Sequence, residues 1–219
     1  MLYIRYVLLF VISLGIGLLT GFYGIELTIA HFILIVFGLL VFIFSDRIFS
    51  FFVLFFSRDM DRVEKILYKQ KHPYYAALLY ITKGDYDEAN KKVELLKKWG
   101  RQKEMRASLK AGLNIEMCDL SAAKKEAEII KNPEIRSYNY ALIALTENEW
   151  ESFRMYKSKL KNKVFLYVLE AEEEFKKGNT EKAEQSGTLA IEASRGLQKY
   201  LLYTSLARQR TKPNRESFF

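Results

Sequence analysis

The hydrophobic and polar positions divide this chain into two parts. Near its start, two runs of about 20 residues carry no charged side chain, Tyr6 to Ile25 and Leu27 to Ser45. A helix of that length can cross a hydrocarbon core of roughly 30 Å. From Arg58 onward charges are frequent, and apolar residues recur at helical spacing. The pattern predicts an all-α chain in which a two-helix transmembrane hairpin precedes a helical domain.

Flanking charges predict the orientation of this hairpin. Arg5 precedes the first run, and a series of Lys and Arg beginning at Arg47 follows the second, whereas the tip between the runs carries only Glu26. Positive residues favour the cytoplasmic side, so we expect both chain ends in the cytoplasm. A cleaved signal peptide is the alternative for the first run. That run is longer than the usual apolar segment of a signal peptide, and a second run follows it.

Small residues in the two runs indicate where helices could pack in lipid. Gly17 and Gly21 lie four residues apart and share a helix face, and Gly38 lies in the second run. Such faces allow close helix approach. The partner face could belong to the same hairpin or to another membrane protein. The aromatic residues from Ile48 to Phe56 then predict either an interfacial helix or a continuation of the second span.

Four stretches in the polar part repeat one pattern, a small residue followed seven, eight, nine and twelve positions later by a turn residue, a polar residue, a bulky residue and a second small residue. The stretches begin at Ala77, Ala111, Ala141 and Ala171, and their turn positions are Gly84, Cys118, Asn148 and Gly178. The steps of 34, 30 and 30 residues predict a solenoid of helical hairpins, which is typical of binding scaffolds. Phe153 replaces the second small residue of the third copy, so we expect that hairpin to be splayed or repacked.

The domain boundaries follow from these patterns. We expect a membrane hairpin with an interfacial segment over 1–57, an amphipathic linker helix over 58–72, a helical repeat domain over 73–210 and a disordered tail over 211–219. The apolar positions Leu197, Leu201 and Leu206 predict a final helix that caps the last repeat, because a solenoid otherwise exposes its stacking face.

Charge and chemistry narrow the function. The net charge is +8, but the cations are interspersed with 26 acidic residues, so an anionic membrane surface is a better partner than nucleic acid. The two histidines and Cys118 cannot form a zinc site of usual spacing, and Cys118 is expected to serve as a turn residue. His31 in the second run could ligate haem, which is a minor alternative. The glutamates from Glu170 to Glu174 are expected on a solvated surface. No catalytic motif is present, so we expect neither an enzyme nor a cofactor.

The repeats resemble tetratricopeptide repeats. Gly84-Asp85-Tyr86 followed by Ala89 matches the turn and second helix of that family closely, and Gly178-Asn179-Thr180 followed by Ala183 matches moderately. The Trp and Leu-Gly signature of the first helix is missing. Residues 1–98 resemble the HemY N-terminal family, with two spans, Ile25-Glu26 entering the second span and Gly-Asp-Tyr soon after. The resemblance implies a membrane-anchored repeat protein of a bacterial plasma membrane.

The sequence therefore predicts a membrane-anchored scaffold that binds a protein or peptide in the groove of its cytoplasmic array. By resemblance, the first helices of the repeats supply the groove. The candidate groove residues are Tyr74, Leu78, Tyr138, Leu142, Phe165 and Phe175. They could instead belong to the core, since an error of one residue rotates a helix face by about 100°. The alternative function is an accessory subunit of a membrane enzyme, protease or transporter that docks through its transmembrane hairpin.

Overall fold

The computed structural model describes residues 15, 17, 21–22, 29–212 and 217–219. These residues form helices and contain no strand, so the all-α prediction is confirmed for them. The chain divides into two units, Met1–Phe52 and Val53–Phe219, and each is described by itself. The helices are α2 (Ile29–Phe56), α3 (Met60–Lys69), α4 (Pro73–Lys83), α5 (Tyr86–Glu94), α6 (Arg101–Glu116), α7 (Leu120–Ile129), α8 (Pro133–Thr146), α9 (Trp150–Lys157), α10 (Lys163–Lys176), α11 (Thr180–Ala193) and α12 (Gly196–Thr211).

The first unit contains most of α2. The first expected span falls largely outside the described residues. Among the residues that are described, no helix combines the length and the apolarity needed to cross a membrane. A Cβ built on Gly17, Gly21 or Gly38 meets no described atom within 4 Å, and because most of the first run lies outside the described residues, the expected packing of small residues stays a prediction. Large apolar side chains of α2 are exposed, among them Leu40 and Phe49.

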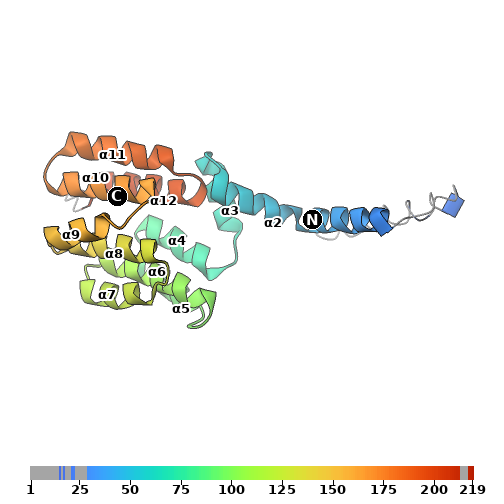
Figure 1. Ribbon diagram of the computed structural model, residues 1–219, viewed down its shortest axis with the longest axis horizontal. Helices are drawn as coiled ribbons and strands as arrows, with labels where there is room; N and C mark the ends of the chain where they lie inside the picture. The colour runs from blue at the N-terminus through green and yellow to red at the C-terminus, as the bar shows by residue number, and fades with distance from the viewer. Residues whose placement is uncertain (1–14, 16, 18–20, 23–28, 213–216) are drawn as a thin grey trace. The chain divides into compact units, whose positions relative to one another are not determined.

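In the second unit, the helices from α4 to α11 pack as four consecutive pairs, α4 with α5, α6 with α7, α8 with α9 and α10 with α11 (Figure 1). Each pair also contacts its neighbour through α5 and α6, α7 and α8, or α8 and α10. The small residues of the predicted pattern explain the close pairing. Ala77, Ala89, Ala111 and Ala123 are completely buried, as are their counterparts in the later pairs. Phe153 is also completely buried and packs with Ala141 and Leu169, so the third pair is repacked around it.

The four turns between paired helices share one backbone geometry. The turn residues Gly84, Cys118, Asn148 and Gly178 all have positive φ angles, from 58° to 83°. In each turn the next N–H donates to a carbonyl five residues earlier, as from Asp119 to Asn114 at 2.8 Å. This is the bond that a left-handed residue makes possible at a helix end. Cys118 is therefore a turn residue, as the sequence predicts.

Two glutamates join successive pairs in a way the sequence pattern does not reveal. One carboxylate oxygen of Glu104 accepts the N–H groups of Lys131 and Asn132, at 3.0 and 2.9 Å. Thirty residues later, Glu134 accepts the N–H groups of Lys161 and Asn162 in the same manner, at 2.8 and 2.6 Å. The first helix of each pair is here called its inner helix. Each of these glutamates lies in the first turn of one inner helix, α6 or α8, and fixes the chain that leads into the next inner helix, α8 or α10.

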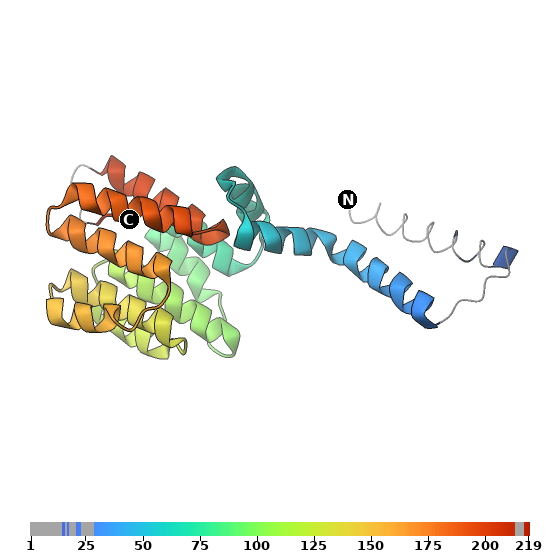
Figure 2. The same cartoon turned by 45° about the horizontal axis from the view of Figure 1, so that its top comes forward.

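Helix α12 lies elsewhere than expected. The sequence predicts a cap on the last pair, and α12 does contact α11, but it also contacts α3 and α4 (Figure 2). Leu197 and Leu201 pack with Tyr74 and Leu78 of the first pair, whereas Leu206 packs with the fourth pair. The helix therefore connects the two ends of the array. Its entry is fixed by Gly196, whose N–H donates to the Ser57 carbonyl at 2.7 Å.

The end of the chain also departs from expectation. The predicted disordered tail begins at Thr211, but α12 continues through that residue. The described residues Ser217, Phe218 and Phe219, here named the tail segment, are ordered against the array. Phe218 is completely buried and Phe219 is 7% exposed. The prediction of disorder is wrong for the tail segment because two adjacent aromatic side chains find an apolar site to bury.

Candidate functional site

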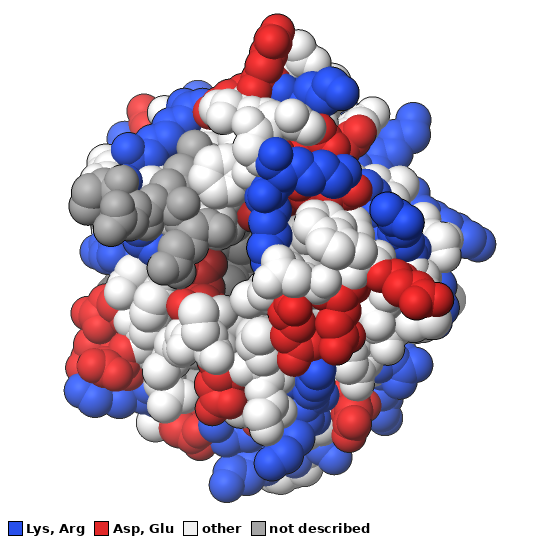
Figure 3. Space-filling model, turned by 90° about the vertical axis from the view of Figure 1, so that its left-hand side faces the viewer, with Lys and Arg blue, Asp and Glu red and all other residues white. Residues whose placement is uncertain are grey.

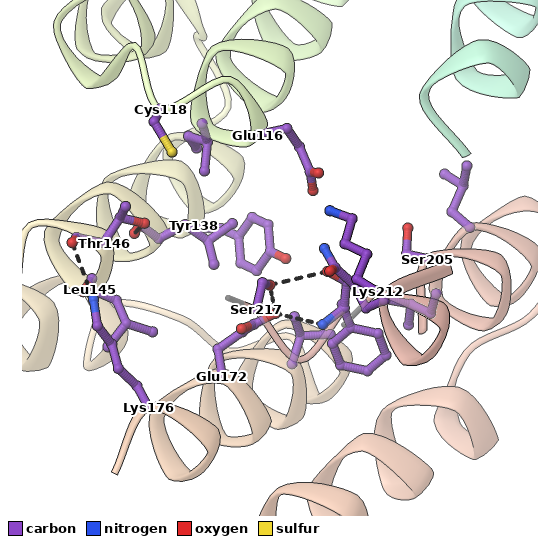
Figure 4. A pocket seen from close by; sticks show the side chains of 17 residues that line it. Glu116, Cys118, Tyr138, Leu145, Thr146, Glu172, Lys176, Ser205, Lys212 and Ser217 are labelled. Carbon is purple, nitrogen blue, oxygen red and sulfur yellow. Dashed lines mark hydrogen bonds between the residues drawn. The ribbon is translucent and has the colours of Figure 1, made fainter. Parts of the chain in front are cut away.

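A cavity of about 290 Å³ lies on the inner side of the array. Its walls come from the first helix of three pairs (α6, α8 and α10), from α12 and from the tail segment (Figure 4). The apolar lining includes Leu142 and Val168, and the polar lining includes Tyr138, Glu172 and Gln209. Polar and apolar residues line the cavity in similar numbers, so it is more polar than the usual ligand site, which has a mostly apolar lining and a few polar groups.

Glu172 holds the tail segment to α10. Its side chain accepts three hydrogen bonds. One comes from the Ser217 hydroxyl at 2.8 Å (Figure 4), and two come from the N–H groups of Phe218 and Phe219, both at 2.9 Å. Burial raises the pKa of Glu172, while these three donors favour its charged form. A buried carboxylate needs such donors, because a charge without partners is costly away from water.

The two aromatic rings of the tail segment fill a socket between α10, α11 and α12. Phe218 lies edge-on to Phe175, with ring centroids 6.1 Å apart, and packs in one cluster with Val168 and Leu206. Gly187 of α11 makes the room: a Cβ at this position would meet Cζ of Phe218 at 2.7 Å. Glycine inside a helix weakens that helix, so Gly187 matters here for the space it leaves.

Two further polar groups border the cavity. The Tyr138 hydroxyl points into it from α8 (Figure 4), and burial raises the pKa of that hydroxyl. Gln209 of α12 is 3% exposed, and its side-chain oxygen, which solvent does not reach, has no hydrogen-bond partner among the described residues.

Beside the cavity, Arg208 of α12 connects three elements. Its guanidinium donates to the Ile81 carbonyl at 2.9 Å, to the Tyr86 hydroxyl at 2.8 Å and to the Glu116 carboxylate at 2.9 Å. The Tyr86 hydroxyl also donates to Glu116. Burial, followed by the hydrogen bond to Glu116, raises the pKa of Tyr86 to about 12. This network fixes α12 on the first two pairs.

The outer surface differs from this inner side. On the end that carries the α10–α11 turn, acidic and basic side chains are interspersed (Figure 3). Several of them form ion pairs, including Lys177 with Glu173 and Glu174 at 2.6 and 3.0 Å.

The predicted groove residues lie in three different settings. Tyr138 and Leu142 line the cavity, and Phe175 packs against Phe218 of the tail segment. Tyr74 and Leu78 are covered by α12, whose residues Leu197 and Leu201 pack in the same apolar cluster. Phe165 stacks on the ring of Tyr138, with ring centroids 4.5 Å apart, and is not among the residues that line the cavity.

Sequence reasoning missed Glu172, Gly187 and the tail segment. Glu172 was expected on a solvated surface with its neighbours, but it is only 9% exposed, whereas Glu170 is exposed. Glu172 lies four residues after Val168 and three after Leu169, and this helical spacing from two buried residues is the signal that could have identified it. No described group of three or more histidine, cysteine or acidic residues could hold a metal ion. The side chain of His31 lies outside the described part of the chain.

Comparison with known protein families, curated proteins and solved structures finds no match to this chain. The resemblance to tetratricopeptide repeats and to the HemY N-terminal family therefore depends on the residues quoted above, and it stays a prediction.

Proposed function

We propose that this protein is a membrane-anchored scaffold, related to tetratricopeptide proteins, that binds a segment of a partner protein on the inner side of its helical array. One observation carries the proposal: the inner side already accommodates an extended piece of polypeptide, the tail segment, and has unfilled volume beside it. The role is binding, without a catalytic step or a cofactor. The identity of the partner is not part of the proposal.

The membrane anchor in this proposal is supported by sequence. The two uncharged runs and the series of cations after the second run favour a hairpin in a bacterial plasma membrane with both ends cytoplasmic. The exposed aromatic side chains of α2, including Phe49 at 56% and Phe55 at 54%, suit a membrane interface. We expect the protein to stay in the membrane fraction after extraction with alkaline carbonate. Its release into the supernatant would argue against an anchor.

The binding function is tested by affinity capture from membranes with matched variants of the full chain. Leu142→Gln places a polar amide in the cavity wall, whereas Leu189→Gln changes an exposed position on α11. We expect the partner recovered with the unaltered chain to be recovered with Leu189→Gln and lost with Leu142→Gln. Thermal unfolding verifies that both variants are folded. Full recovery with a folded Leu142→Gln chain would show that the partner binds elsewhere.

The alternative role, an accessory subunit that docks through the hairpin, is favoured by the small residues Gly21 and Gly38 in the two uncharged runs. Close helix approach at such positions is abolished by a large side chain. Gly21→Leu should then lose the partner while Leu142→Gln keeps it, which is the opposite result from that expected for groove binding.

A further inference from the structure

The contacts that hold the tail segment are of a kind that another polypeptide could reproduce. Two of the three donors to Glu172 are backbone N–H groups, of Phe218 and Phe219, and the third is the Ser217 hydroxyl. Backbone donors are present in every segment, so side chains set the specificity. The required features are one hydroxyl and two adjacent aromatic rings.

The socket for these rings is also independent of the rest of the tail. Its walls are side chains of α10, α11 and α12, with Phe175 and Leu206 among them, and its depth comes from the missing side chain at Gly187. A ring from any chain that presents its backbone to Glu172 would reach the same walls. Aromatic side chains in such pockets usually dominate the affinity of an interface.

The site extends beyond the tail segment. The cavity of about 290 Å³ borders Ser217 and Phe219, and Gln209 is among its lining residues. The tail segment thus leaves volume for further residues of a longer ligand.

We infer that the inner groove recognises a partner segment in which a hydroxyl residue precedes two aromatic residues, and that the tail segment competes with the partner for this place. This inference rests on the proposed scaffold function. The tail would act as an internal ligand that keeps the socket filled until a partner segment with more contacts displaces it.

A tethered competitor has a predictable effect on affinity. A segment joined to its own site by a short connection has an effective concentration on the order of millimolar. Partner segments therefore bind the intact chain with a reduced apparent affinity. It equals the affinity for an empty socket multiplied by the fraction of molecules in which the socket is empty. Weakening the tail should raise the apparent affinity of an added peptide by about tenfold or more.

The test uses the full chain in lipid nanodiscs and a fluorescein-labelled, amidated peptide of sequence Pro-Asn-Arg-Glu-Ser-Phe-Phe. Fluorescence anisotropy compares the intact chain with a double variant, Phe218→Ser and Phe219→Ser, that vacates the socket. We expect the double variant to bind the peptide about tenfold or more tightly than the intact chain. Adding Gly187→Ala to the double variant should abolish binding, because the new methyl occupies the position of the ring. A peptide with two alanines in place of the phenylalanines is the control ligand.

Three results would overturn the inference. Equal binding by the intact chain and the double variant would show that the tail does not compete. A folded double variant that fails to bind the peptide would show that the socket does not accept a separate segment. Unfolding of the double variant, seen as lost helical circular dichroism, would make the tail an irreplaceable part of the core.

Light scattering distinguishes a socket filled by the molecule's own tail segment from one filled by the tail segment of a second copy of this chain. If the tail of one molecule seated in another, the intact chain would be dimeric and the double variant monomeric by light scattering, which would contradict competition within one chain. Failure of the peptide test leaves the proposed function separately measurable, since membrane capture by the intact chain and its loss in Leu142→Gln do not depend on the peptide.

Discussion

At the scale of single residues, three residue types adopt one backbone conformation at the four turns. Glycine occupies the left-handed turn in the first and fourth pairs, cysteine in the second and asparagine in the third. The sequence predicts these turns because the residues on either side keep the same spacing. The left-handed position carries a cost for every residue with a Cβ, and that cost is greatest for β-branched residues.

Cys118 offers a measure of this cost. We expect Cys118→Val to lower the free energy of unfolding by about 1–2 kcal/mol, because valine resists a φ of 58°. Cys118→Gly should be close to neutral, since relief of the strained φ is offset by greater freedom of the unfolded chain. Urea unfolding of both variants provides the comparison. Equal stabilities would mean that the turn relaxes without strain.

The buried carboxyl group of Glu172 should make the stability of the fold depend on pH. Burial raises its pKa above the ordinary value of 4.5. A group with a raised folded pKa contributes its full stability below the unfolded value and loses it as the pH rises through the folded value. The unaltered chain should therefore lose stability relative to Glu172→Gln as the pH rises above about 4.5, as seen in paired thermal unfolding curves. A difference that grows in favour of the unaltered chain over this range would contradict the raised pKa.

At the scale of elements, the period of the sequence has a physical cause that residue patterns do not reveal. Glu104 and Glu134 lie one period of 30 residues apart, and each satisfies two backbone N–H groups ahead of the next inner helix. The two clamps hold successive pairs in the same register. Their ligands are backbone groups, so no complementary side chain marks them in the sequence.

Removing one clamp should be costly. Glu134→Ala leaves two backbone donors without a charged acceptor, and we expect a loss of about 2 kcal/mol in the free energy of unfolding. Glu192→Ala, at an exposed position in the last turn of α11, is the matched control and should change stability by less than about 0.5 kcal/mol. Chemical denaturation measures both. A loss no larger than that of the control would show that water replaces the clamp.

The sequence predicts the paired helices well and the last element poorly, for a physical reason. Local spacing, turn residues and small residues specify α4 to α11, because each pair is stabilised by neighbours in sequence. The site of α12 depends on contacts more than a hundred residues apart, such as Arg208 with Ile81. The apolar residues of α12 indicate a helix but not which surface it covers. The groove candidates Tyr74 and Leu78 were therefore assigned to an open face that α12 occupies.

At the scale of the whole unit, α12 changes how the array should unfold. An open solenoid is stabilised by nearest neighbours, and its ends can unfold independently. Here α12 contacts both α4 and α11, so the first and fourth pairs share an element. The array is therefore expected to unfold as one cooperative unit, unlike an open solenoid of the same length.

Arg208 tests that coupling. Arg208→Leu removes the partner of Glu116, and we expect a loss of about 2–3 kcal/mol. Amide hydrogen exchange should quicken in both α4 and α11. The control is Arg210→Ala, whose ion pair with Glu184 is exposed and contributes less than about 1 kcal/mol. Faster exchange confined to α12 would argue that the two ends of the array are not coupled.

The connection between α12 and the first pair has a consequence for synthesis on the ribosome. Tyr74 and Leu78 leave the ribosome long before Gly196, and at about 5–20 residues per second the interval is on the order of 10 s. During that time the inner surface of the nascent array lacks the helix that later covers it. Chains stalled before Gly196 should show α4 cut by protease where the finished protein resists cleavage. A partner or chaperone that recognises the inner surface would meet it first during translation.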